Sequence, residues 1–179
     1  MSDKCTSKSL VIEPLKKDHA SKLFKVLKDP KLYIYIPEDP PTNKEALASK
    51  FDTLSKGAPS HLAELWLNYA VYDSDISRYV GTVQATIFMD DKKASVAYIL
   101  NSKYWGKGYA THALLLMINQ VIREYGVIEF EACIDTRNTK SIELVKRLGF
   151  EYTDFEENAD FFRGKPSHEY TYTAKSEIF

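Results

Sequence analysis

One stretch of this sequence decides the fold: Asn101-Ser-Lys-Tyr-Trp-Gly-Lys-Gly-Tyr-Ala-Thr111. It lies between an apolar, strand-like run that ends at Leu100 and a long helical pattern. Gly106 and Gly108 have no side chains to keep a ligand from the backbone, and they permit dihedral angles that other residues avoid. The first amides of the following helix, with the positive end of its dipole, form an anion site without a basic side chain. The sequence therefore predicts a phosphate-binding turn, and a plain strand-to-helix turn is the alternative.

The same residues carry a family resemblance. The run from Tyr104 to Thr111 resembles the pyrophosphate-binding turn of the GNAT acetyltransferase superfamily, and in particular its ribosomal-protein N-acetyltransferase branch. The chain departs from that pattern at Lys103, where the superfamily favours Gln or Arg, and at His112, where the branch usually has Glu. Neither change removes a backbone donor, so CoA binding is expected to survive both. The resemblance implies that the pyrophosphate of acetyl-CoA is held by Trp105, Gly106, Lys107, Gly108, Tyr109, Ala110 and Thr111.

A second motif that resembles the branch lies between Asp135 and Phe150. It has Asn138, two residues, Ser141, and then a helix that closes on Leu-Gly-Phe. The resemblance implies that Asn138 contacts the CoA arm, that Ser141 lies near its sulfur, and that Arg147 reaches the adenosine phosphates. Asn138 and Ser141 are thus the candidate catalytic residues, although helix capping is an ordinary use of both residue types. Many other GNAT branches place a tyrosine proton donor where this chain has Val145, which directs attention to Ser141.

The central part of the chain predicts a meander followed by a crossover. Short turns at 73–78 and 90–93 join three strand-like runs, so neighbouring strands should be antiparallel. The helix after the phosphate turn and the strand at 127–135 form a right-handed crossover, so the strands on either side of it should be parallel. If these two strands splay where the turn begins, backbone groups in the gap can bind an extended ligand. The resemblance assigns the pantetheine-binding strand to Tyr98, Ile99 and Leu100.

The rest of the chain supplies the other elements of an α/β fold of the α+β type. The expected elements are a strand at 9–12, helices at about 17–28, 42–56 and 138–148, and strands at 152–155 and 168–174, the last two flanking an acidic, aromatic loop. Together they predict a GNAT-like mixed, mostly antiparallel sheet of about seven strands, with a splayed central pair and helices on both faces.

The segment between the first two expected helices is a candidate acceptor site. Its part from residue 31 to 41 contains three prolines besides Tyr33 and Tyr35, so it should be a loop with exposed aromatic side chains. The resemblance implies that Tyr33, Tyr35 and Ile36 line the substrate entrance. Tyrosines packed under a loop are an equally good account.

Composition narrows the class of protein. A length of 179 residues suits a single domain, 1–179, with 44% hydrophobic and 27% charged residues. The formal net charge of -1 gives no electrostatic case for nucleic acid or an anionic membrane. Cys5 and Cys133 form no metal-ligand spacing with the four histidines, and no run is fit to cross a bilayer, so we expect no metal and a cytoplasmic location.

Acetyl transfer from a thioester to an amine needs a neutral nucleophile, donors for the developing oxyanion and a proton for the departing thiolate. Direct attack by the bound amine is preferred, because Cys133 has no base near it in sequence. Three interpretations remain: an acetyltransferase for a protein or peptide N-terminus, which the branch resemblance favours; one for a small amine, polyamine or antibiotic; and a non-catalytic acyl-CoA-binding module. The partners are then acetyl-CoA and an amine, and the chain is a monomer or a homodimer.

Overall fold

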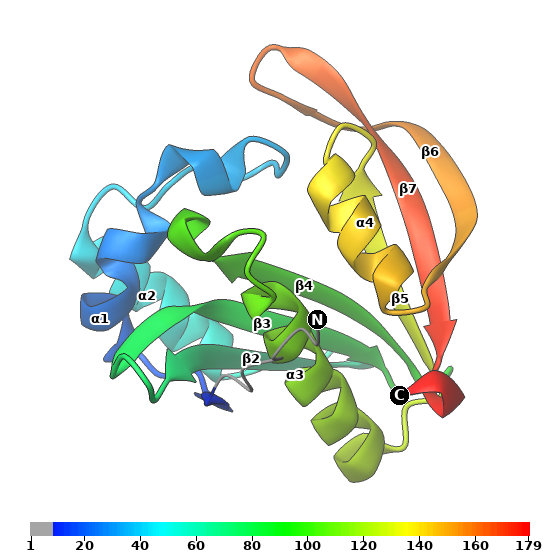
Figure 1. The fold of residues 1–179 in the computed structure, drawn as a ribbon, viewed down its shortest axis with the longest axis horizontal. Coiled ribbons are helices and arrows are strands. Elements are labelled where there is room, and N and C mark those ends of the chain that lie inside the picture. Colours follow the sequence, from blue (N-terminus) through cyan, green and yellow to red (C-terminus); the bar gives the residue numbers. More distant parts are fainter. Residues whose placement is uncertain (1–8) are drawn as a thin grey trace, which may run out of the picture.

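The chain forms one mixed sheet with helices on both faces, as seen in a computed structural model that describes residues 9–179 (Figure 1). The strands are β1 (Leu10–Pro14), β2 (Glu64–Asp73), β3 (Arg78–Phe88), β4 (Lys93–Leu100), β5 (Glu129–Asp135), β6 (Glu151–Phe162) and β7 (Lys165–Lys175). The α-helices are α1 (His19–Leu27), α2 (Lys44–Ser55), α3 (Tyr109–Tyr125) and α4 (Thr139–Arg147), and the short 3-10 helices are η1 (Pro30–Tyr33), η2 (Ser102–Tyr104) and η3 (Ser176–Ile178). The predicted fold class is confirmed.

The seven strands within residues 9–179 follow the order β1-β2-β3-β4-β5-β7-β6. Neighbours are antiparallel except β4 and β5, which the α3 crossover makes parallel. That parallel pairing covers only three residues on each strand, from Lys93 to Ser95 on β4 and from Glu129 to Glu131 on β5. Beyond Ser95 the two strands diverge, so the sheet opens into a gap at the end of β4 that leads into the glycine turn.

Two hydrophobic clusters hold the helices against the sheet. On one face, α3 and α4 bury side chains such as Met117 and Leu144 in the larger cluster. On the other face, α1 and α2 pack through Leu23 and Phe51, and this smaller cluster includes Ala70 of β2. The long helix after the glycine turn therefore buries one side in the core, and each face of the sheet carries its own layer of helices (Figure 1). None of the helices within residues 9–179 is long and apolar enough to cross a membrane.

The C-terminal hairpin is longer than the sequence pattern indicates. The expected acidic loop after Phe155 continues β6 as far as Phe162, and Arg163 and Gly164 make the turn with φ angles of 51° and 74°. Positive φ at both central residues is the geometry of a tight hairpin turn. Because β6 is an edge strand and exposed along most of its length, its acidic residues do not alternate with buried apolar ones. Periodicity therefore gave no strand signal there.

Candidate active site

The glycine turn presents open backbone at the start of α3. Gly106 and Gly108 have φ angles of 71° and 78°, and an added Cβ at Gly106 would meet no atom within 4 Å. The first hydrogen bond of the helix runs from the amide of His112 to the carbonyl of Gly108 at 3.1 Å. The amides of Ala110 and Thr111 come before it and have no acceptor within the helix. This geometry fits a diphosphate, which needs close approach to amides rather than a cavity of cationic side chains.

The turn is held at both ends by hydrogen bonds to other parts of the fold. Ser102 donates its hydroxyl to Asp29, just before η1, at 2.6 Å, and Tyr109 donates to Asp73 at the end of β2. Tyr104 stacks on Tyr109 with ring centroids 4.5 Å apart. The conformation of the turn therefore depends on β2 and on the α1–η1 junction as well as on its glycines.

Trp105 joins the two sequence motifs. Its indole N–H donates to the carbonyl of Leu100 at 3.1 Å, and the Nζ of Lys140, on the first turn of α4, lies 5.2 Å from its ring centroid. Trp105 as a whole is 40% exposed. Lys107, by contrast, points its Nζ to the ring of Tyr104, at 5.8 Å from the centroid.

Alternate residues of β4 direct their backbone N–H and C=O groups to the gap, while the residues between them pair with β3. Asn101 donates its amide to the carbonyl of Val80 at 2.8 Å, which marks a hydrogen-bonded pair with β3. Because such pairs alternate in an antiparallel ladder, Ile99 is paired with β3, whereas the peptide groups of Tyr98 and Leu100 are turned to the gap. Trp105 already occupies the Leu100 carbonyl. The side chain of Ile99 packs toward α1 and α2, on the other face of the sheet.

A hydrogen bond between side chains crosses from β4 to α4 beside this gap. The hydroxyl of Tyr98 donates to Ser141 Oγ at 3.0 Å, and the amide of Ser141 donates to Asn138 Oδ1 at 3.3 Å. Burial raises the pKa of Tyr98, although Ser141 and the exposed, cationic Arg147 lower it. The capping role of Asn138 is present, and it places the hydroxyl of Ser141 next to the gap.

The loop after η1 is fastened to the hairpin at the opposite end of the chain. Arg163 donates from Nη1 to the carbonyl of Ile36 at 2.9 Å and from Nη2 to the carbonyl of Glu38 at 2.8 Å. Tyr35 is 36% exposed, whereas Tyr33 is 4% exposed and has a pKa raised to about 12 by burial. The structure thus places Tyr33 under the loop and leaves Tyr35 accessible. Sequence reasoning missed Arg163, because its partners lie about 125 residues away.

A buried carboxylate that sequence reasoning also missed lies at the end of β5. Asp135 is 4% exposed and accepts from Ser167 Oγ at 2.6 Å and from Arg137 Nε at 2.8 Å. Burial alone would raise the pKa of Asp135, but these hydrogen bonds and the Arg137 amide together hold it at about 2. The Asp-Thr-Arg sequence was the available signal, since an aspartate often binds the amide two residues further along the chain.

Further carboxylates lie on the same face of β5, β6 and β7. Phe130, Ala132 and Ile134 point into the core with α3 and α4, so the alternate side chains of β5 point to the opposite face. Burial and the charges of neighbouring carboxylates raise the pKa of Glu169 on this face. The face carries Glu131, Cys133, Asp135, Glu156, Asp160 and Glu169.

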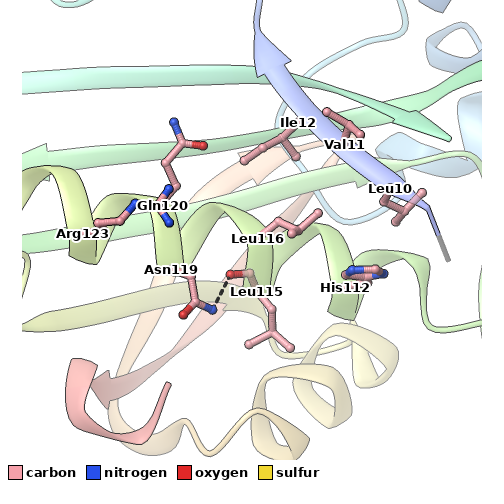
Figure 2. A pocket seen from close by; sticks show the side chains of 9 residues that line it. All are labelled: Leu10, Val11, Ile12, His112, Leu115, Leu116, Asn119, Gln120 and Arg123. Carbon is pink, nitrogen blue, oxygen red and sulfur yellow. Dashed lines mark hydrogen bonds between the residues drawn. The ribbon is translucent and has the colours of Figure 1, made fainter. Parts of the chain in front are cut away.

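A separate groove of about 390 Å³ lies between β1 and α3, lined by Leu10, Val11, Ile12, His112, Leu115, Leu116, Asn119, Gln120 and Arg123 (Figure 2). It contains none of the predicted site residues, although His112 is one turn beyond the glycine turn. Within residues 9–179, no three His, Cys, Asp or Glu side chains are grouped to hold a metal ion.

Comparison with known proteins identifies the family of this chain. The sequence matches the family described as "Acetyltransferase (GNAT) domain" over residues 9–151. It is 25% identical over 84 residues to an uncharacterized N-acetyltransferase p20 from Bacillus licheniformis; the aligned stretch covers 46% of this chain and 47% of that protein, about half of its length. The chain belongs to the GNAT acetyltransferase family.

Two solved structures share the fold at low sequence identity. One is an acetyl transferase from Salmonella typhimurium that modifies the N-terminal serine of a 50S ribosomal subunit protein (TM-score 0.80, 15% identity, 95% of this chain and 96% of that chain). The other is a spermidine N-acetyltransferase from Vibrio cholerae in complex with CoA and spermine (TM-score 0.79, 15% identity, 94% of this chain and 96% of that chain). At this identity the likeness concerns the fold.

Proposed function

We propose that this protein is an acetyl-CoA-dependent N-acetyltransferase that acts by direct attack, with the α-amine of a protein or peptide N-terminus as its acceptor. One observation carries the proposal: the gap between β4 and β5 is bounded by the open glycine turn at its end and by Ser141 at its side. Bound acetyl-CoA would supply the thioester. Groups of this chain then bind and orient the substrates, stabilise the oxyanion and assist the departing thiolate.

Each group along the gap has its own role in binding or catalysis. The turn from Trp105 to Thr111 binds the pyrophosphate through its backbone amides. The peptide groups of Tyr98 and Leu100 bind and orient the extended arm and stabilise the developing oxyanion, while the side chain of Ile99 forms an apolar wall on the opposite face. Ser141 donates a hydrogen bond to the departing sulfur. Val145 is fully buried in the core, so α4 offers no tyrosine hydroxyl for that step.

An α-amine suits this site because the site offers little help in deprotonating the nucleophile. No carboxylate lies on β4. Asp135 is nearby but fully engaged, and a pKa of about 2 makes it a poor base near neutral pH. An α-amine has a reference pKa of about 7.7 to 8.0, against about 10.4 for lysine, so a useful fraction is already neutral.

A small polycationic amine is the second candidate acceptor. The observation that favours it is the group of carboxylates on β5, β6 and β7, on the face of the sheet opposite α3 and α4. Glu169 has its pKa raised by burial and by the charges of Asp160, Glu156 and Asp135, so these groups lie close together. A cationic acceptor would relieve their repulsion.

One assay separates these candidates. The purified protein is given acetyl-CoA with N-terminal peptides, polyamines or aminoglycosides, release of free thiol is followed, and mass spectrometry locates the acetyl group. Acetylated peptide N-termini support the main proposal. Acetyl groups on polyamines alone, or on internal lysines with free N-termini untouched, contradict it. Tight CoA binding without thiol release for any acceptor would indicate a non-catalytic binding module.

A further inference from the structure

In the hydrogen bond between the hydroxyls of Tyr98 and Ser141, Tyr98 is the donor and Ser141 the acceptor. A phenol, with a pKa of about 10, is a stronger acid than an aliphatic alcohol, so the tyrosine hydroxyl is the better donor of the pair. Tyr98 donates to Ser141 Oγ at 3.0 Å. A serine hydroxyl has one hydrogen and two lone pairs, so accepting from Tyr98 leaves its own hydrogen for another acceptor.

The surroundings of the pair keep that arrangement. Asn138 Oδ1 takes the amide of Ser141, which fixes the first turn of α4, and within residues 9–179 the Ser141 hydroxyl makes no side-chain hydrogen bond other than the one with Tyr98. Tyr98 lies between β4 and α4, and burial raises its pKa, which keeps the phenol protonated at neutral and mildly alkaline pH. The pair also lies beyond Ser95, where the pairing of β4 with β5 has ended.

We infer that Tyr98 is a positioning residue: its hydroxyl holds Ser141 so that the serine hydrogen is directed into the gap, toward the sulfur of CoA. This inference rests on the proposed function. In the transfer, the bond between the acyl carbon and sulfur breaks and the sulfur keeps the electron pair. Ser141 stabilises that thiolate through its O–H, and the sulfur gains one proton as the attacking nitrogen loses one.

The test compares the binding of CoA with that of desulfo-CoA by calorimetry between about pH 7 and pH 9.5. A free thiol has a reference pKa of about 8.5, and each unit by which the site lowers it adds a tenfold gain in CoA affinity at high pH. Desulfo-CoA lacks only the thiol, so the ratio of the two affinities at each pH removes the contribution of the other titrating groups. In the wild-type protein, CoA should gain affinity over desulfo-CoA as the pH rises.

Two variants and a control then isolate Tyr98. Tyr98→Phe and Ser141→Ala should each reduce the gain severalfold, and the double variant should reduce it no further. Tyr69→Phe is the matched control, because Tyr69 is another buried tyrosine of the same core with a pKa raised to about 12 by burial, and it should keep the full gain. Should Tyr98→Phe fail to fold, 3-fluorotyrosine at position 98 replaces it; the more acidic phenol should increase the gain.

The outcomes are distinct. If neither ligand binds the wild-type protein, the proposed function is wrong. If both bind but the wild-type protein shows no pH-dependent gain, Ser141 does not stabilise the thiolate and the inference falls with it. If Ser141→Ala loses the gain and Tyr98→Phe retains it, or if fluorination leaves it unchanged, Tyr98 only fills space and the inference is overturned.

Discussion

Tyr109, the first residue of α3, donates its hydroxyl to the carboxylate of Asp73 at a distance of 2.6 Å. Asp73 is 1% exposed, and its other oxygen accepts from the amide of Asp75 at 2.9 Å. The hydrogen bond to Asp73, with burial adding to it, raises the pKa of Tyr109 to about 12. The end of β2 therefore fixes the direction in which α3 leaves the glycine turn, and with it the direction of the amides that would bind the pyrophosphate.

Replacing Tyr109 with Phe should weaken both the fold and CoA binding. The ring can still stack on Tyr104, but one buried carboxylate oxygen of Asp73 loses this donor, which costs about 1–3 kcal/mol. We expect urea unfolding to show that loss and calorimetry to show CoA binding weakened severalfold. Asp73→Asn keeps an oxygen acceptor without the charge and should lose less. Equal stability of Tyr109→Phe and the parent would show that the bond does not hold the turn.

Replacing Gly108 with Val should abolish CoA binding. The left-handed backbone at φ 78° strains a branched residue, and its side chain would crowd the amides of the turn. Gly57→Val is the matched control, because Gly57 has the same φ of 78° at the end of α2, with no atom within 4 Å of an added Cβ. Both variants should lose similar stability, and only the first should lose CoA. If Gly108→Val binds CoA as tightly as the parent, the phosphate site lies elsewhere.

Features that depend on residues close together in the sequence were predicted best. The turn around Gly106 and the helix that begins after Asn138 depend on glycine conformation, capping and periodicity, which a short window of sequence contains. The splay of β4 from β5 was expected from the crossover and the family resemblance together. These are the parts of the fold that were correctly predicted.

What the sequence did not indicate depends on pairs that only the tertiary fold brings together. Nothing local links Tyr98 to Ser141, 43 residues away, or Arg163 to Ile36, 127 residues away. The length of β6 was missed for a different reason: an exposed edge strand has no buried face to impose alternation. Tyr33 and Tyr35 illustrate the same limit, since aromatic content identified a loop but could not tell the buried ring from the exposed one.

Removing the side chain of Arg137 should lower the free energy of unfolding, because it leaves the buried carboxylate of Asp135 without its cationic partner. Arg137→Met leaves the carboxylate with Ser167 and a backbone amide only, and because Arg137 itself is about one-third exposed we expect a loss of about 2–3 kcal/mol at pH 7. Because the pKa of Asp135 is lowered in the folded protein, its carboxylate adds to the free energy of unfolding at pH values above the ordinary aspartate pKa. This contribution is lost as the pH falls toward 2. The difference between variant and parent in urea unfolding should therefore shrink at pH 3. An equal difference at both pH values would mean that packing, and not charge, is what Arg137 provides.

Neutralising Glu169 should stabilise the protein at neutral pH. Its pKa is raised, first by burial and then by Asp160, Glu156 and Asp135, so its favourable contribution is present below the ordinary glutamate pKa and is lost as the pH rises. Glu169→Gln should thus raise the unfolding midpoint at pH 7 by a few degrees and have little effect at pH 4. Glu151→Gln, an exposed change of equal charge on β6, should be neutral at both. A destabilised Glu169→Gln at pH 7 would show that the carboxylate has an attractive partner.

Ser141→Ala should lower kcat while leaving CoA affinity near neutral pH almost unchanged, since the backbone of the glycine turn is untouched and Asn138 caps α4 through the amide of residue 141. A thiol with a reference pKa of about 8.5 is a fairly good leaving group and needs only a modest donor. General-acid help is typically about 10²- to 10⁴-fold, and a hydrogen bond to a soft thiolate should fall at or below the lower end. The measurement is steady-state turnover at saturating acetyl-CoA, with Thr139→Ala, a neighbouring exposed hydroxyl on the same helical turn, as the control. Unchanged kcat, in an assay where thiol release limits turnover, would leave Ser141 as a structural residue of the helix and remove the proposed proton donor from the gap.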